Sequence, residues 1–282
     1  MRHRLSLVAI ALLIAAALLS ACQQQGPAIP NDPVEAVKTF AEKQKDVKSQ
    51  HLDINLDFTM KMTGLQSTEP AAALFSNFKA TASASGDFDS VKQDFTLSGS
   101  ADLGILTAFV VPDAEEIKFE LVKAGDTLYS RLADQAWSTT NVPATSETQN
   151  AAELLDFASL LQKTAKAERL DDESVDGTDT YHFKVTLDPV ELLNEISKAA
   201  GVAGSLSLNE LSQAAEYLKN STVELDLWVG KADLLIRQEK IYFKLDLKDL
   251  PNTPPDAAIL AEINMTVKAS KINQPVTITA PK

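Results

Sequence analysis

Apolar and polar residues alternate along much of this chain. From Leu52 to Met62, apolar residues occupy every second position and polar residues fill most of the positions between them. A period of two indicates a β-strand with one dry face and one wet face. The same alternation returns at 91–98, 117–121, 181–187, 223–229, 241–247 and 263–267. Parallel strands are buried on both faces and are continuously apolar, so this pattern predicts one large, curved antiparallel sheet.

Two turn motifs agree with an antiparallel sheet. Asp176-Gly177 separates the segment 167–175 from the segment 178–187, and Asp-Gly is a favoured two-residue hairpin connection. The segment 123–126 predicts a second hairpin, which leads into a strand at 128–132 and a short strand around Trp137. Neighbouring strands in the sequence are therefore expected to pair with each other.

Four segments carry helix start signals. Asp32, followed by Pro33 and Glu35, predicts a short amphipathic helix that ends near Val47. Comparable signals at Asn150, Asp188 and Ser207 precede apolar residues at helical spacing. The apolar faces of these helices must be buried. We expect them to pack against the apolar face of the sheet. Helices on one face of an antiparallel sheet give an α+β architecture.

One apolar segment does not follow either period. Residues 104–112 begin with Gly104, end with Pro112 and include Phe109. The segment fits a buried strand, which we favour, or an apolar lip that touches a bilayer when lipid is exchanged.

The first 22 residues are built like a secretory signal. Arg2, His3 and Arg4 precede an apolar run over 5–18, and the run ends in the sequence Leu-Ser-Ala-Cys at 19–22. This ending resembles the lipobox of bacterial lipoproteins. The resemblance implies cleavage after Ala21 and acylation of Cys22 through a thioether. The alternatives are an ordinary secretory signal or a transmembrane helix, but the apolar run is shorter than the roughly 20 residues that span a bilayer.

These signals divide the chain into three parts. Residues 1–21 are the expected signal peptide, and residues 22–31 are the acylated cysteine with a flexible tether that is rich in polar and helix-breaking residues. Residues 32–282 are expected to form a single domain. The acyl anchor would hold this domain outside the cytoplasm at the bacterial cell membrane.

Charge and chemistry exclude several classes of function. The formal net charge of −13 is unsuited to nucleic acid, whose recognition depends on Lys and Arg. Cys22 is the only cysteine, so no intrachain disulfide is expected. His51 and His182 both stand at polar positions of strands, which predicts surface histidines. The acidic residues at 171–179 lack the spacing of a calcium loop and predict a solvated hairpin.

Three local patterns resemble a known family. They are the sequence Leu-Tyr-Ser-Arg at 128–131 followed by Trp137, the hairpin at 175–183, and the sequence Leu-Asp-Leu-Trp-Val at 225–229 followed by 233–237. Together with the order of elements they are similar to LppX/LprG-type lipoproteins and, more distantly, to the LolA and LolB carriers. The resemblance implies a strongly curved half-barrel whose concave apolar face is covered by helices, with a cavity for acyl chains between them.

The resemblance also implies a function. It predicts a membrane-anchored lipoprotein that binds an acylated lipid or glycolipid and carries or presents it within the cell envelope, in concert with an envelope transporter. The alternative is a sensor or scaffold lipoprotein that uses the same fold to bind a protein partner. No catalytic motif is recognisable, and neither an enzyme, a cofactor nor a metal is expected. The candidate lipid-binding residues are Leu154, Phe157, Leu161, Leu192, Ile196 and Phe109.

Overall fold

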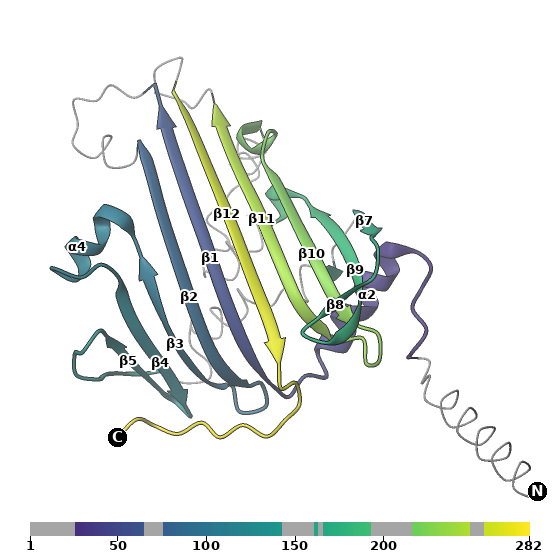
Figure 1. The fold of residues 1–282 in the computed structure, drawn as a ribbon, viewed down its shortest axis with the longest axis horizontal. Coiled ribbons are helices and arrows are strands. Elements are labelled where there is room, and N and C mark those ends of the chain that lie inside the picture. The colour runs from purple at the N-terminus through teal and green to yellow at the C-terminus, as the bar shows by residue number, and fades with distance from the viewer. Residues whose placement is uncertain (1–25, 65–75, 143–160, 163–165, 193–215, 249–256) are drawn as a thin grey trace, which may run out of the picture.

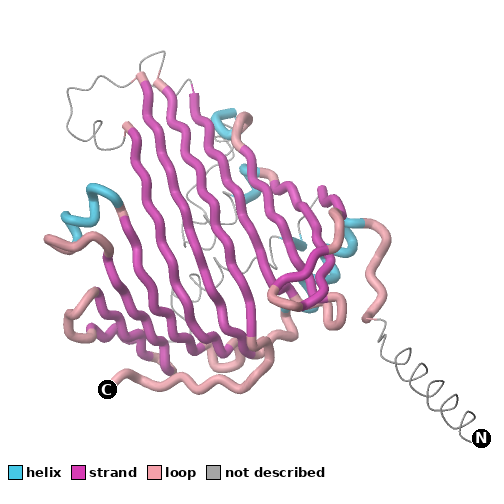
Figure 2. The backbone as a smooth tube through the Cα atoms, in the orientation of Figure 1, coloured by secondary structure: helices cyan, strands magenta, loops and turns pink. Residues whose placement is uncertain are grey.

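One antiparallel sheet dominates the protein (Figures 1 and 2). The structure is a computed structural model that describes residues 26–64, 76–142, 161–162, 166–192, 216–248 and 257–282. The first half of the chain supplies β1 (Ser49–Thr63), β2 (Asn77–Asp89), β3 (Asp94–Asp102), β4 (Ile117–Ala124), β5 (Thr127–Leu132) and β6 (Ser138–Asn141). The second half supplies β7 (Lys166–Arg169), β8 (Glu173–Val175), β9 (Thr178–Leu187), β10 (Thr222–Gly230), β11 (Ile236–Lys248) and β12 (Ala258–Ser270).

The strand order explains how the sheet is assembled. It runs β6-β5-β4-β3-β2-β1-β12-β11-β10-β9-β7, with β8 paired to β9. The first and last strands, β1 and β12, therefore lie side by side in the middle of the sheet (Figure 1). Every pairing is antiparallel. The predicted open, curved antiparallel sheet is confirmed, with few helices among the described residues.

Both predicted hairpins are present. Asp176 and Gly177 have φ of 48° and 81° and connect β8 to β9, as the type I′ preference of Asp-Gly requires. Gly125, with φ of 60°, turns β4 into β5.

The predicted N-terminal helix is α2 (Pro33–Gln44). The side chain of Asp32 accepts a hydrogen bond of 3.0 Å from the backbone N–H of Glu35, which satisfies one free donor at the helix start. Asp188 accepts a hydrogen bond of 2.7 Å from the N–H of Val190 in the same way. The rest of the helix expected there, like most of those expected from Asn150 and Ser207, lies outside the described residues.

The register gives the sheet one apolar side and one polar side. In antiparallel pairs, directly opposite residues share a side, and one such row runs across nine strands. It contains Phe183, Leu227, Glu239, Val267, Ile54, Ala84, Gly99, Phe119 and Leu132. Apart from Glu239, every member of this row is apolar or glycine.

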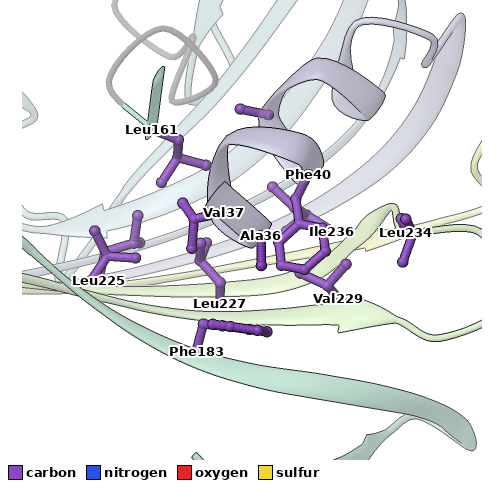
Figure 3. Packing of buried hydrophobic residues seen from close by; sticks show 12 residues of the cluster. Ala36, Val37, Phe40, Leu161, Phe183, Leu225, Leu227, Val229, Leu234 and Ile236 are labelled. Atoms are coloured by element: carbon purple, nitrogen blue, oxygen red, sulfur yellow. The ribbon is translucent and has the colours of Figure 1, made fainter. Parts of the chain in front are cut away.

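The tightest packing is at one end of the apolar side, under α2. Val37 and Phe40 of α2 are fully buried there, and so are Leu227 and Phe183 of the sheet, with at most 1% exposed. The rings of Phe40 and Phe183 meet edge to face with centroids 5.2 Å apart. Figure 3 shows α2 lying over these strand residues, with Leu161 beside it. We call this region the α2-packed end; it comprises α2, Leu161 and the apolar side of β9 and β10.

Three details differ from the sequence analysis. The strand β2 is present although no strand was predicted there. Residues 104–110 form a 3₁₀ turn, η1 (Gly104–Leu106), and a short helix, α4 (Thr107–Val110), so the favoured buried strand was wrong. Val91 lies in the turn before β3 with 72% of its side chain exposed, so the predicted start of that strand was also wrong.

Candidate functional site

Beyond α2, most positions on the apolar side of the sheet are only partly buried, although Phe78, Ile117 and Ala261 are buried. Leu56 and Phe58 of β1, Ala82 of β2, Phe243 of β11 and Ile263 of β12 all have intermediate exposure. We call this region the half-buried apolar face; it comprises the apolar side of β1 to β4, β11 and β12. These residues belong to the alternating pattern seen in the sequence. Their side chains lie on the same side of the sheet as α2.

The half-buried apolar face has a shallow strip along β2. Ala80, Ala82, Ala84 and Gly86 follow one another on this side of the strand. The strip ends in an aromatic pair at each end of β2, and both pairs have ring centroids 5.8 Å apart: Phe78 with Phe58, and Phe88 with Phe95. The ten residue-to-residue steps from Phe78 to Phe88 span roughly 33 Å at ~3.3 Å per step. The strip is therefore long enough for an extended acyl chain, which occupies half of a hydrocarbon core of ~30 Å.

A few polar side chains stand on this apolar side, among them Glu239 and Gln50. Glu239 of β11 has 9% of its surface exposed, and burial raises the pKa of its carboxyl to about 7. Gln50 of β1 is half-buried, and its Oε1 atom is buried without a hydrogen-bond partner. The sequence analysis missed Glu239, although it stands two positions before Ile241 and therefore in the apolar phase of its strand.

The predicted lipid-binding residues are placed unevenly. Leu161 is fully buried in the α2-packed end. Leu192 is half-buried in the turn that Asp188 caps. Phe109 lies in α4, but its side chain is outside the described part of the chain. The remaining predicted residues, Leu154, Phe157, Ile196 and the lipidation site Cys22, lie outside the described residues.

The polar side of β9 and β10 is more enclosed than expected. His182 was predicted to be a surface histidine, but it is only 7% exposed. Its ring stacks on Trp228 with centroids 4.3 Å apart and an interplanar angle of 17°. Glu173 of β8 binds both, since it accepts a 2.9 Å hydrogen bond from Trp228 Nε1 and lies 3.3 Å from His182 Nδ1. The histidine is covered because a large indole occupies the neighbouring position on this side.

Several other charged groups on the polar side form pairs typical of a solvated sheet surface. The side chain of Glu224 binds Lys184 at 2.8 Å, and this hydrogen bond raises the pKa of the lysine. His51 lies 2.7 Å from Asp87 and 3.0 Å from Ser85. These contacts join neighbouring strands on the polar side of the sheet.

The acidic segment 171–179 is also paired. Burial by itself would raise the pKa of Asp172, but hydrogen bonds from Lys231 and Arg169 lower it below its usual range. Asp176 accepts a 3.3 Å hydrogen bond from Lys268. No three His, Cys, Asp or Glu side chains in the described residues gather as metal ligands. A hollow of about 510 Å³ at residues 169–172 lies at the β7 edge, away from the half-buried apolar face.

No helix within the described ranges is long and apolar enough to cross a membrane.

Comparison with known proteins finds similarity at the level of the fold. No family model matches the chain, and no curated protein matches it. Lipoprotein LppX of Mycobacterium tuberculosis is 14% identical, with a TM-score of 0.43, and the match covers 86% of this chain and 98% of that one. LprF of Mycobacterium bovis is also 14% identical, with a TM-score of 0.46, over 87% of this chain and 96% of that one.

A LolA-superfamily protein of Nitrosomonas europaea is 8% identical, with a TM-score of 0.25, over 86% of this chain and 94% of that one. The chain is thus similar to LppX- and LprF-type lipoproteins and, more distantly, to LolA-superfamily proteins, as the local sequence patterns predicted.

Proposed function

We propose that this protein is a lipoprotein of the bacterial envelope that binds the acyl chains of a lipid or glycolipid on its half-buried apolar face. It carries or presents that lipid within the envelope and needs neither a cofactor nor a catalytic residue. Cys22 is expected to carry the acyl anchor, and residues 32–282 are expected to form the lipid-binding domain.

One observation carries the proposal: a broad apolar face whose side chains are only half-buried. A fold that needed this surface solely for its own core would cover it as fully as α2 covers Phe183 and Leu227. In this proposal the acyl chain lies along the small side chains of β2 from Ala80 to Ala84, because they project less from the sheet than larger side chains would.

The physics of lipid transfer favours such a surface. Each methylene that leaves a membrane for water costs ~0.8 kcal/mol, so a lipid with two or more chains does not cross an aqueous gap unprotected. An apolar sheet face of this extent replaces the contacts that the chains lose. A lipid anchor on the same chain keeps the carrier close to the membrane from which it loads.

The decisive experiment is native mass spectrometry of the full chain with Cys22→Ser, secreted by its own N-terminal segment from a bacterial host. We expect a stoichiometric adduct whose extract contains acyl chains. Leu56→Glu should abolish the adduct, because it places a charge in the middle of the half-buried apolar face.

Asn55→Glu is the matched control, since Asn55 is the exposed neighbour on the opposite side of β1. It should keep the adduct, and near-ultraviolet circular dichroism should show that both variants are folded. A wild-type protein that is free of adduct at every step would contradict lipid carriage and favour the partner-binding alternative. An adduct that survives Leu56→Glu would place the lipid elsewhere on the molecule.

A further inference from the structure

Glu239 stands at the boundary between two regions on the apolar side of the sheet. Its neighbour across the strand pair on one flank is Leu227, which is fully buried in the α2-packed end. Its neighbour on the other flank is Val267, which belongs to the half-buried apolar face and pairs in turn with Ile54. A lipid chain that lies across the half-buried apolar face toward α2 therefore meets this carboxyl where that face borders the α2-packed end.

No described residue forms a hydrogen bond or ion pair with the carboxyl of Glu239. The residue as a whole is 9% exposed. On the same strand, Arg237 is already bound to Asp233. On α2, the side chain of Gln44 accepts a 3.2 Å hydrogen bond from the N–H of Ile236.

An unpartnered carboxyl in an apolar surface is costly. Burial without a hydrogen bond costs ~1–3 kcal/mol for a neutral polar group and more for a charged one. Burial also raises the pKa of Glu239 to about 7, so that near neutral pH a large fraction of the carboxyl is protonated. A protonated carboxyl donates one hydrogen bond and accepts others, which suits an uncharged oxygen group of a ligand.

We propose that Glu239 anchors the polar end of the bound lipid through a hydrogen bond to an uncharged oxygen group, a hydroxyl or an ester carbonyl, at the border of the half-buried apolar face. This inference rests on the proposed function and names the ligand class more closely. The favoured ligands are lipids in which an acyl chain is joined to a hydroxylated or esterified head. A bare hydrocarbon of the same length fills the apolar face but leaves the carboxyl unpaired.

The test compares two probes of equal chain length, 1-palmitoylglycerol and hexadecane, each delivered from cyclodextrin to the secreted full chain with Cys22→Ser. We expect Glu239→Leu to weaken binding of 1-palmitoylglycerol roughly tenfold, the size of one hydrogen bond in a dry site. The same variant should leave hexadecane binding unchanged or make it tighter. Glu239→Gln keeps a donor and an acceptor, and should stay within about threefold of the wild type for both probes.

Infrared spectroscopy gives a readout that a purely structural role would not change. The carbonyl band of the protonated Glu239 carboxyl should shift when 1-palmitoylglycerol is added, stay in place with hexadecane, and be absent in Glu239→Gln. Glu262→Leu is the matched control, because Glu262 stands on the neighbouring strand β12 but on the polar side, opposite Lys244. It should bind both probes as the wild type does.

The outcomes separate this inference from the proposed function. If the wild type binds both probes and Glu239→Leu affects them equally or not at all, the anchor is wrong and lipid binding stands. If the wild type binds neither probe, the proposed function fails and the anchor fails with it. Glu239→Leu replaces an unpaired buried carboxyl with an apolar side chain, so it should be folded, and near-ultraviolet circular dichroism checks this.

Discussion

The α2-packed end and the half-buried apolar face lie on the same side of one sheet and have the same alternating sequence pattern. They differ in what covers them. At the α2-packed end, Phe40 and Val37 fill the space above Phe183 and Leu227, and all four side chains are almost completely excluded from water. On the half-buried apolar face, Phe58 and Ile263 keep part of their surface exposed. Among the described residues, the difference shows that burial along one side of the sheet follows what packs above each strand.

The largest expected effect comes from removing a large side chain at the α2-packed end. Phe40→Ala should lower the free energy of unfolding by about 3–5 kcal/mol, because it removes a fully buried ring and leaves a cavity. Phe58→Ala should cost roughly 1–2 kcal/mol, since its ring is only half-buried and water can fill the space. Urea denaturation in the absence of lipid measures both.

Equal losses in these two variants would contradict the comparison, because the half-buried apolar face would then be as much a part of the core as the α2-packed end. The slope of the unfolding free energy against urea concentration should be the same in both variants. An equal slope shows that both variants expose the same surface on unfolding, so that their free energies can be compared.

The next effect concerns the border between the two regions and depends on pH. The pKa of Glu239 is about 7 in the folded protein against an ordinary value of 4.5, so the folded state holds this proton more tightly than the unfolded state. Stability from this group is present below pH 4.5 and is lost as the pH rises through about 7. Glu239→Gln should therefore be more stable than the wild type at pH 8 by up to about 3 kcal/mol.

The difference between the wild type and Glu239→Gln should shrink as the pH falls and vanish well below pH 4.5, because the wild-type carboxyl is then protonated in both states. Thermal unfolding of the two proteins at several pH values measures this difference and cancels the titration of the other carboxylates. A stability difference that does not change with pH would mean that the carboxyl is hydrated in the folded protein.

The smallest expected effect concerns the cap of α2. Asp32→Ala removes the hydrogen bond to the N–H of Glu35 and should cost about 1 kcal/mol. Because α2 covers only one end of the sheet, hydrogen exchange should quicken in α2 and in the β9 and β10 amides beneath it. The amides of the β1–β2 pair should be little affected. Uniform quickening across the sheet would instead indicate that the two regions unfold as one unit.

Some errors of the sequence analysis have a local cause. The strand β2 was missed because alanine, serine and glycine have low strand propensity, although they alternate between Phe78 and Phe88. The turn at 90–93 forms because Asp89 accepts hydrogen bonds from the N–H groups of Val91 and Lys92. Both signals were present in the sequence, and a search for small-residue alternation and for Asx turns would have found them.

Local hydrogen bonds and backbone conformation explain why the segment 104–110 does not form the predicted strand. Gly104 has a φ of +56°, which ends β3, and its N–H donates to the side chain of Asp102 at 2.7 Å. The hydroxyl of Thr107 accepts a 2.8 Å hydrogen bond from the N–H of Leu103, which closes the segment around η1. Local side-chain bonds to the backbone thus outweighed the apolar character of the segment.

The sequence by itself determined most strands of the sheet other than β2, their apolar and polar sides, the Asp-Gly hairpin and the start of α2. These features depend on neighbouring residues, through the period of two, the geometry of a two-residue turn and the capping of free N–H groups. Only the tertiary structure decided that β1 pairs with β12, that His182 is covered by Trp228, and that α2 seals one end of the apolar side while Glu239 marks its border. These features depend on residues far apart in the chain, because burial is set by what packs above a side chain and not by the side chain itself.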